Sequence, residues 1–199
     1  MEEINVGVLA LQGDFEEHIK ILKKIDVQAT EVRFPEQLDE IDGLIIPGGE
    51  STTINKLMDK YRFKERLKVF QSSGRPIFGT CAGLIILGSD VSDKGFGLGF
   101  IDMKVKRNAY GRQIDSFEEM VSINFDHKPD PAEFKSVFIR APKIVYTGKN
   151  VKVLSSLEDE VLLAREKNIL VCSFHPELTD DTRIHEYFIE MINENLEEK

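Results

Sequence analysis

Cys81 is the residue whose surroundings point most directly to chemistry, because they match a frame that exposes a nucleophile. Residues 79–83 read Gly-Thr-Cys-Ala-Gly and lie between an apolar stretch and a segment with helical character. Glycines two positions before and after the central residue let a strand and a helix approach closely around a strained turn, which exposes the central side chain. A helix N-terminus behind the sulfur favours the thiolate, the reactive form of cysteine. The frame therefore predicts that Cys81 is a nucleophile.

The alternative is that Cys81 is a small buried residue in a glycine-rich turn. For a cysteine taken at random, burial is the better explanation, since free cysteine is among the most buried residue types. The complete frame reverses that balance. The other cysteine, Cys172, lies in the apolar run 170–172 without such a frame, and we expect it to be structurally buried.

A thiol that attacks an amide needs a base that returns a proton to the departing nitrogen, and His175 is the best candidate. It follows an expected strand and is followed by Pro176 and Glu177. In an extended chain, residues i and i+2 point the same way, so Glu177 should lie beside the imidazole and fix its tautomer. The other histidines are expected to be solvated or half-packed, in amphipathic helices (His18, His185) or in a polar loop (His127).

Backbone N–H groups near Cys81 can hold an oxyanion. The segment 47–51 (Pro-Gly-Gly-Glu-Ser) ends a strand expected next to that of the cysteine, so the N–H groups of Gly48, Gly49 and Ala82 are candidates. A phosphate cradle is the rival interpretation, but the lysine of a P-loop is missing; for this motif alone an ordinary turn stays open. The glycine-rich segment 95–99 neither opens a helix nor follows the first strand, so we expect a turn there rather than a dinucleotide loop.

The elements that position these residues follow from the hydrophobic pattern. Apolar runs alternate with helical segments over about the first 90 residues, which predicts a mostly parallel sheet with helices on both faces. The second half holds short β-rich runs separated by turns, which predicts antiparallel β additions; an amphipathic helix closes the chain. The expected strands are 4–10, 28–34, 43–46, 76–79, 101–106, 120–125, 137–139, 151–154, 161–164 and 169–172; the expected helices begin at 14, at 51 or 52, at 82 and near 184; and 126–135 is expected to be a surface loop.

Composition narrows the function classes. A chain of 199 residues that is 41% hydrophobic suits one core, so we expect a single domain over residues 1–199. A net charge of −9 without a basic cluster disfavours a nucleic-acid partner. The acidic start and the short longest apolar stretch, 76–89, argue against export and membrane segments. Two distant cysteines make no disulfide framework, so we expect a cytoplasmic protein.

These motifs resemble those of the class I (triad-type) glutamine amidotransferases, which carry a Gly-x-Cys-x-Gly elbow and a His-Pro-Glu segment. More narrowly, the chain is similar to the family of glutaminase subunits of pyridoxal 5′-phosphate synthase. The motifs of this closer resemblance run in order along nearly the whole chain: 7–13 (GVLALQG), 47–53 (PGGESTT), 79–85 (GTCAGLI), 107–113 (RNAYGRQ), 138–142 (FIRAP) and 173–179 (SFHPELT).

The resemblance implies a flavodoxin-like α/β fold and hydrolysis of L-glutamine to L-glutamate and ammonia by Cys81, His175 and Glu177. The ammonia would pass to a separate (β/α)₈-barrel synthase subunit that makes pyridoxal 5′-phosphate (vitamin B6); no cofactor or metal is implied. The residues implied to contact glutamine are Gln12, Gly49, Glu50, Ser51, Arg107, Ile139 and Arg140. From the residues alone, each arginine has two interpretations, a fork on the substrate α-carboxylate or a surface salt bridge.

Two other functions compete with this one. A freestanding thiol hydrolase, such as a γ-glutamyl hydrolase, would share the elbow and the histidine but should lack the synthase-specific segments. A silent regulatory module on the same fold would be expected to lose the nucleophile or the base, and both are present. Ammonia release from glutamine, with and without the barrel subunit, distinguishes these alternatives.

Overall fold

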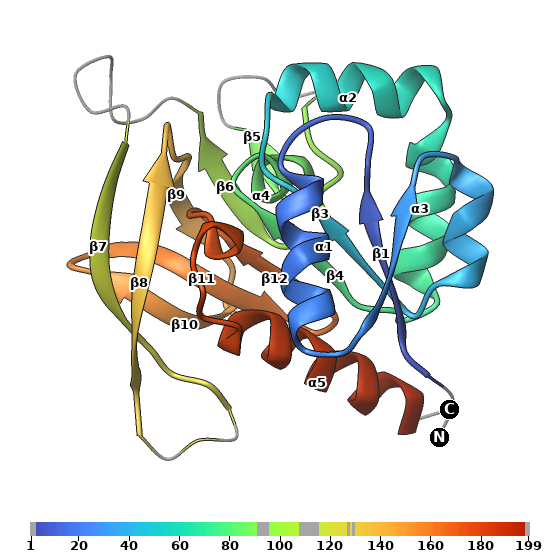
Figure 1. Cartoon of the computed structure of the whole chain (residues 1–199). Helices are drawn as coiled ribbons and strands as arrows, with labels where there is room; N and C mark the ends of the chain where they lie inside the picture. The colour runs from blue at the N-terminus through green and yellow to red at the C-terminus, as the bar shows by residue number, and fades with distance from the viewer. Residues whose placement is uncertain (1–2, 91–95, 108–115, 127, 129, 198–199) are drawn as a thin grey trace.

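The computed structural model describes residues 3–90, 96–107, 116–126, 128 and 130–197. A nine-stranded mixed sheet runs through the molecule, and a second, three-stranded sheet packs beside it (Figure 1). The large sheet has the order β2 (Gln28–Val32), β1 (Asn5–Leu9), β3 (Gly43–Ile46), β4 (Ile77–Thr80), β12 (Ile169–Cys172), β11 (Glu160–Glu166), β10 (Lys152–Leu157), β7 (Ser116–Ile123), β8 (Ala132–Ile139). The small sheet has the order β5 (Ser89–Asp90), β6 (Met103–Lys106), β9 (Lys143–Thr147).

Strand direction divides the large sheet as the hydrophobic pattern predicts. The five strands from β2 to β12 are parallel, and the four from β11 to β8 are joined by antiparallel pairings. The four inner parallel strands, β1, β3, β4 and β12, are short and mostly apolar, which is typical of strands buried on both faces. The edge strand β2 carries polar residues and is largely exposed or half-buried. The fold class predicted from the sequence is therefore confirmed.

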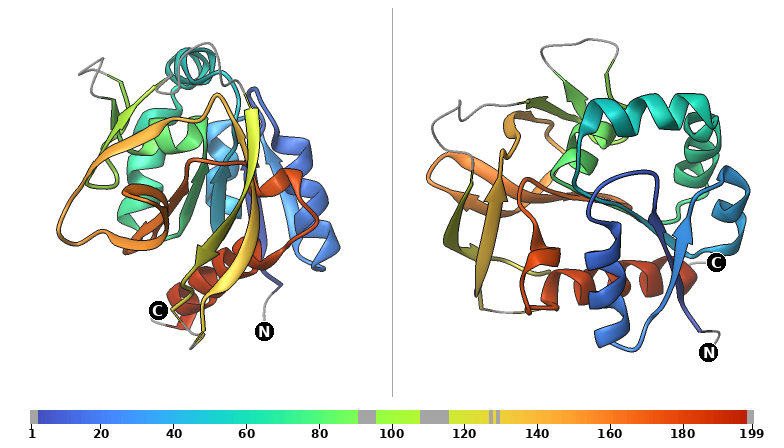
Figure 2. Two further views of the ribbon diagram at one scale, coloured as in Figure 1. Left: turned by 90° about the vertical axis from the view of Figure 1, so that its left-hand side faces the viewer. Right: turned by 45° about the horizontal axis from the view of Figure 1, so that its top comes forward.

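Helices cover both faces of the parallel half. The first group comprises α1 (Phe15–Lys24) and α5 (Arg183–Glu197), and the second α2 (Ser51–Lys60), α3 (Phe63–Ser72) and α4 (Ala82–Leu87). Neighbouring residues of β3 show the division: Ile45 packs in one core with Leu22 and Phe188, whereas Ile46 packs in the other with Met58. Successive strand side chains point to opposite faces, so one strand serves both cores. Figure 2 shows the same layers from two further directions.

Several predicted elements have different bounds. The helical stretch expected to run from residue 51 to 70 is two helices, because Arg62 takes a left-handed φ of 59° between them. The loop expected over 126–135 is wrong for its last residues, since β8 begins at Ala132 and pairs with β7 along its length. Phe134 is buried between the charged residues Glu133 and Lys135, and these charges hid the first half of the strand. Strands β5 and β9 were not anticipated.

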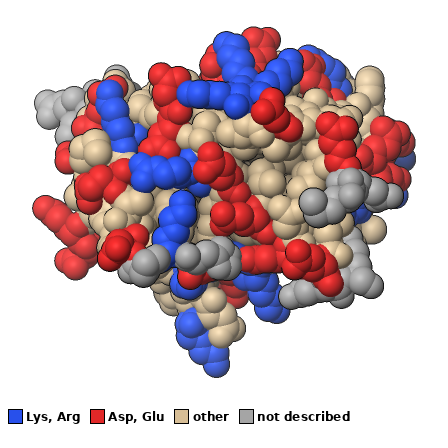
Figure 3. Space-filling model, turned by 60° about the horizontal axis from the view of Figure 1, so that its bottom comes forward, with Lys and Arg blue, Asp and Glu red and all other residues tan. Residues whose placement is uncertain are grey.

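Charge and hydropathy are distributed as on an ordinary protein surface. On the face shown in Figure 3, lysine and arginine side chains are interspersed with acidic ones. Within the described part of the chain, no helix is both long and apolar enough to cross a membrane.

The glycine-rich segment at 96–99 is irregular, without helix or strand, as expected.

Candidate active site

Four neighbouring parallel strands end at the same edge of the sheet, and the segment after each one carries a candidate residue. Strand β4 leads into Cys81, β12 into His175, β3 into the turn at 48–49, and β1 into Gln12. The register aligns these ends, since Thr80 pairs with Cys172 and Gly79 with Ile46. Ligands of open α/β sheets bind at this carboxyl edge.

The turn at Cys81 has the strained geometry that the glycine frame predicts. Cys81 has φ 47° and ψ −98°, values that L-residues rarely adopt. A Cβ on Gly83 would lie 2.1 Å from the carbonyl oxygen of Ile46, and one on Gly79 would lie 2.7 Å from the backbone of Gly83. Both glycines are therefore required for the close approach of β4, β3 and α4. The Cys81 sulfur lies 3.9 Å from the carbonyl oxygen of Ile139.

His175 and Glu177 contact each other, although not through the extended chain that the sequence argument assumed. Residues Pro176–Leu178 form a 3₁₀ turn, and within it the Glu177 Oε1 lies 2.7 Å from Nδ1 of His175. The backbone N–H of His175 donates to the carbonyl of Val137 in β8 at 2.8 Å. Both side chains are almost fully buried. The base is thus held from two directions, and Nε2 is the ring nitrogen left free for chemistry.

Electrostatics favour the imidazolium form of His175. Burial lowers its pKa, but the hydrogen bond with Cys81 and the contact with Glu177 outweigh burial and raise that pKa to about 10. Burial raises the pKa of the Glu177 carboxyl, and its hydrogen bond with His175 opposes this increase. The neighbours of the His175 ring are a sulfur and a carboxylate, and both stabilise a cation. At neutral pH the site therefore holds a charged proton donor.

A cavity of about 480 Å³ opens beside these residues. It has room for a small amino acid and exposes both the sulfur and the imidazole. Of the residues selected from the sequence, the lining contains Gln12, Gly49, Glu50, Ser51, Cys81, Ala82, Arg107, Ile139, Arg140 and His175. Gly13, Asp14, Thr52 and Ile85 also line it but were not selected. Gly13, Thr52 and Ile85 lie within the quoted motifs and Asp14 directly follows one, which was the signal that could have found them.

Gly48 lies behind the imidazole, where a side chain would not fit. A Cβ on Gly48 would lie 2.4 Å from Cε1 of His175. The Gly48 carbonyl accepts a hydrogen bond from the backbone N–H of Asp14 at 3.1 Å. Because the following peptide is trans, the N–H of Gly49 points away from Asp14. Gly49 has φ 147°, a conformation that suits glycine alone.

Two predicted substrate residues are engaged in holding this turn. The Gln12 side-chain oxygen accepts from the backbone N–H of Glu50 at 2.8 Å. The Glu50 carboxylate caps α2 by accepting from the N–H groups of Thr52 and Thr53. Its hydrogen bond with the Thr53 side chain leads the interactions that lower its pKa to about 2. Glu50 therefore stays ionised and fixes the loop that lines the cavity.

Arg107 makes an ion pair and also borders the cavity. Its Nε forms an ion pair with the buried carboxylate of Asp90, and its guanidinium stacks 4.4 Å from the ring centroid of Phe96. The same side chain lines the cavity. Arg140 lines it from the end of β8, with φ 43°. The rest of the motif 107–113, from residue 108 onward, lies outside the described residues.

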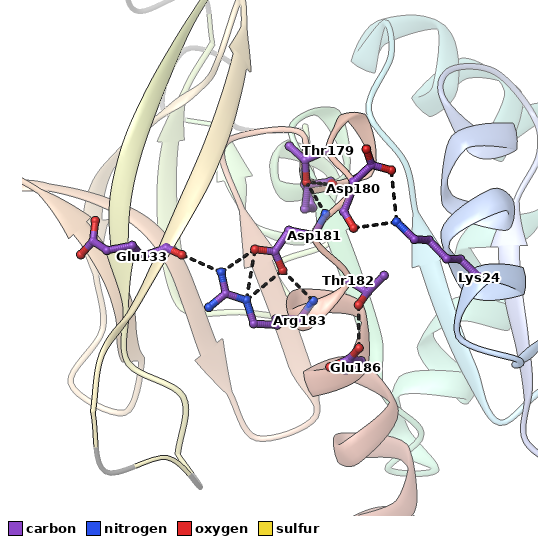
Figure 4. Close-up of polar contacts among 9 residues, drawn as sticks. Lys24, Glu133, Thr179, Asp180, Asp181, Thr182, Arg183 and Glu186 are labelled. Atoms are coloured by element: carbon purple, nitrogen blue, oxygen red, sulfur yellow. Dashed lines mark hydrogen bonds and ion pairs between the residues drawn. The ribbon is translucent and has the colours of Figure 1, made fainter.

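The segment after Glu177 is tied to both sides of the fold (Figure 4). Lys24 of α1 donates to the carbonyl of Asp180 at 2.9 Å. Arg183 donates to the carboxylate of Asp181 at 2.9 Å and to the carbonyl of Glu133 in β8 at 2.6 Å. These contacts fix the connection between the 3₁₀ turn and α5, and hence the position of Glu177 relative to both helices of that face.

Two expectations about the remaining polar residues have clear outcomes. His18 and His185 are fully buried, so the prediction of solvated or half-packed positions is wrong. Each lies on the same helix face as buried apolar residues, Leu22 for His18 and Phe188 for His185, which was the missed signal. Cys172 is fully buried as expected, and His127 lies outside the described residues.

Asp14, His175 and Glu177 place possible ligand atoms within 4.8 Å of one another. The Nδ1 of His175 already pairs with Glu177, so Asp14 is the one member of this cluster outside that pair. This arrangement orients an imidazole, and we assign no metal to it.

Fold and site together define a class I glutamine amidotransferase. The chain belongs to the SNO glutamine amidotransferase family, whose model matches residues 8–194. It is 52% identical over 190 residues to the "Pyridoxal 5′-phosphate synthase subunit PdxT" of Thermosipho africanus, covering 95% of this chain and 99% of the relative. The protein of the same name from Fervidobacterium nodosum is also 52% identical, with 95% and 97% covered.

Solved structures agree with this assignment. A crystal structure of a glutamine amidotransferase superimposes with a TM-score of 0.88 at 44% identity and covers 94% of this chain and 98% of that one. The structure of PurLQS from Thermotoga maritima gives a TM-score of 0.72 at 14% identity, with 98% and 100% covered. The second likeness is one of fold alone.

Proposed function

We propose that this chain hydrolyses L-glutamine to L-glutamate and ammonia and supplies the ammonia to pyridoxal 5′-phosphate synthase. The observation that carries the proposal is the meeting of the Cys81 elbow with the His175–Glu177 pair beside the cavity. Relatives that carry the synthase-subunit name match this chain over nearly its whole length. A freestanding hydrolase would not require that match.

In the first step, the Cys81 sulfur attacks the γ-amide carbon of glutamine, and the carbonyl electrons move to the oxygen. His175, as the imidazolium, then donates its Nε2 proton to the departing nitrogen, so that ammonia leaves and a γ-glutamyl thioester remains. Neutral His175 next removes a proton from water, which attacks the thioester and releases glutamate. Glu177 holds the ring through Nδ1 and stabilises its charged form in both steps.

The oxyanion of each tetrahedral intermediate needs preorganised donors. We assign this role to the backbone N–H of Ala82, at the start of α4, and to the N–H groups of the turn at Gly48 and Gly49. The Gly48 carbonyl is bonded to Asp14, so presentation of a second donor would require this peptide to turn. Glycine makes such a rotation inexpensive, since it has little conformational preference.

The cavity lining supplies candidates for substrate recognition. Arg107 and Arg140 are cations that can bind the α-carboxylate of glutamine, and the backbone around Gly49 to Ser51 borders the same space. Ile139 borders it beside the nucleophile, with its carbonyl near the sulfur. Gln12 and Glu50 also line the cavity, and their side-chain oxygens hold its loop by accepting from the backbone N–H groups of residues 50, 52 and 53.

Delivery requires a second subunit. Free ammonia at neutral pH is mostly protonated and no longer nucleophilic, so the acceptor enzyme should bind directly to the glutaminase. We assign the acceptor a (β/α)₈-barrel fold and a cytoplasmic setting. We also treat residues 1–199 as a single glutaminase domain, since strands from both halves of the chain share one sheet.

The test is ammonia release from glutamine by the purified chain mixed with the synthase subunit. Cys81→Ala should abolish the release and also the labelling of the chain by thiol-reactive glutamine analogues. Cys172→Ala is the matched control, because Cys172 is buried and lies outside the cavity lining, and it should retain both properties. Labelling at Cys172, or turnover in Cys81→Ala, would overturn the assignment.

A further inference from the structure

The Glu177 carboxylate has one oxygen whose partner the triad does not supply. Oε1 pairs with His175, whereas Oε2 is buried and makes no hydrogen bond within the described part of the chain. Nε2 of His18 lies 3.5 Å from Oε2, and both side chains are fully buried. A buried carboxylate oxygen without a donor is costly, so this contact needs an explanation.

His18 continues into a chain of polar groups that crosses the core between α1 and α5. Its Nδ1 lies 2.9 Å from Nε2 of His185, and its Nε2 lies 3.2 Å from Oγ1 of Thr80. All three side chains have zero exposure. The Phe78 ring packs against both imidazoles in T-shaped contacts. Its centroid lies 6.3 Å from that of His18 and 5.9 Å from that of His185. His18 and His185, which the sequence pattern placed at the surface, are therefore buried in the core next to Glu177.

Elimination of tautomers fixes the direction of the proton donors. If His18 donated from Nδ1 to His185, its bare Nε2 would face the Glu177 carboxylate, and two acceptors would be in contact. That arrangement would also leave a buried, unpaired N–H on Nδ1 of His185, which has no partner among the described residues. In the opposite arrangement, His185 donates from Nε2 to Nδ1 of His18, and the His18 Nε2–H points to Oε2 of Glu177 and to Thr80. Only the second arrangement avoids both penalties.

Charge states support the same arrangement. Burial, followed by the neighbouring His185 and His175, lowers the pKa of His18 well below its usual range. Burial lowers the pKa of His185 to about 3. Both rings are therefore neutral at pH 7, each with one donor and one acceptor nitrogen. A neutral donor steadies the carboxylate without competing with His175 for its charge.

We infer that His18 is a positioning residue for the glutaminase reaction, that it holds the second oxygen of Glu177 from behind, and that His185 fixes its tautomer. The Nε2–H is shared between Oε2 and Thr80, so this is a bifurcated and moderate contact rather than a short one. Its effect is to keep Oε1 aimed at His175. Neither His18 nor His185 lines the cavity, so substrate binding should not depend on them. This inference rests on the proposed function.

The central experiment compares His18→Leu with His18→Gln in the full chain bound to the synthase subunit. Leucine removes the donor, whereas the amide N–H of glutamine restores one near the position of Nε2. We expect His18→Leu to lower kcat about 10-fold or more, with KM changed less than about twofold. His18→Gln should recover most of the loss. Equal kcat in the leucine variant and the wild type would overturn the inference.

A pH profile separates positioning from packing. The titratable groups that face Glu177 are His175, His18, Asp14 and Cys172, and only His18 is altered. Loss of its donor should raise the pKa of the carboxyl and move the acid limb of kcat to higher pH by about half a unit or more. Leu22→Ala, which disturbs the buried face of α1 but removes no polar group, should lower Tm but leave that limb in place. The same displacement in Leu22→Ala would overturn the inference.

A second variant keeps the test decisive if His18→Leu does not fold. His185→Leu frees the tautomer of His18 and should lower kcat by a smaller factor, again with KM nearly constant; unchanged kcat would overturn the inference. The wild-type complex is measured first. A wild-type complex without glutaminase activity would refute the proposed function, whereas an active wild type with unaffected variants would refute this inference alone.

Discussion

Gly48 and His175 are in such close contact that no side chain fits between them. A methyl group on Gly48 would lie 2.4 Å from Cε1 and 3.0 Å from Nδ1 of the imidazole. Real Cβ contacts are longer than the first distance, so either the ring or the turn would have to move. The turn that we assign to the oxyanion and the base that protonates the leaving group are therefore mechanically coupled.

Gly48→Ala should consequently lower kcat on the order of 10²-fold, because it displaces either the imidazole or an oxyanion donor. Glutamine hydrolysis in the presence of the synthase subunit measures the effect. Gly99→Ala is the control, since a Cβ at Gly99 has open space around it, its nearest neighbour being Ser89 Oγ at 3.8 Å, although the φ of Gly99 is positive, at 65°. Gly99→Ala should cost about 1 kcal/mol of stability and retain activity. Wild-type kcat in Gly48→Ala would contradict the coupling.

Glu177→Gln should keep the fold and lower kcat on the order of 10²-fold, because the amide holds the ring but does not stabilise its charge. The loss should be smaller than in His175→Ala, which removes the proton donor altogether. Circular dichroism checks the fold, and steady-state glutaminase assays with the partner measure kcat. If Glu177→Gln matched the wild type, Glu177 would not belong to the triad.

Activity should depend on the partner. In the isolated chain the Gly48 carbonyl is bonded to the N–H of Asp14, and we expect docking of the synthase subunit to turn this peptide so that an N–H faces the substrate. One misplaced oxyanion donor costs on the order of 10²-fold in rate. Titration of the chain with synthase subunit should therefore raise kcat steeply until the complex is saturated, with a smaller change in KM. Full activity of the chain alone would show that no such gate exists.

Stability should fall as the pH drops below about 6.5, because two buried histidines cannot be protonated in the folded state. Folding lowers the pKa of both His18 and His185, so the unfolded chain binds more protons in this range. Each histidine should add a slope of up to about 1.4 kcal/mol per pH unit. The raised pKa of His175 has the opposite sign, and its contribution is lost only as the pH rises from 6.5 towards 10.

Urea unfolding at several pH values between 5 and 7.5 measures this slope. The His185→Leu variant is the comparison, since it lacks one of the two titrating rings and should show a shallower dependence. An identical slope in the variant and the wild type would mean that His185 does not titrate differently in the two states.

Much of the site could be predicted from the sequence, because its signals are local. Cys81 is marked by the glycines on either side of it in a strand–turn–helix pattern, and Glu177 is two residues from its partner. The contact that requires Gly83 is nevertheless made with Ile46 of the neighbouring strand. The apolar runs of the parallel half indicated the sheet and the edge at which the site lies. Glu177 pairs with His175 as expected, but the backbone that brings them together is a 3₁₀ turn and not the extended chain that the sequence suggested.

The residues that the sequence left undecided are those whose environment comes from distant segments. The sequence did not show whether Arg107 forms an ion pair, because its partner, Asp90, is placed beside it only by the fold. His18 looked solvated because its helix also carries charges, yet its ring meets His185, 167 positions further along the chain. Local pattern determines which element a residue belongs to and which face it occupies. Whether a polar side chain on that face is solvated or buried depends on the partner that packs against it, and here only the crossing of α1 and α5 over the same strands decided that.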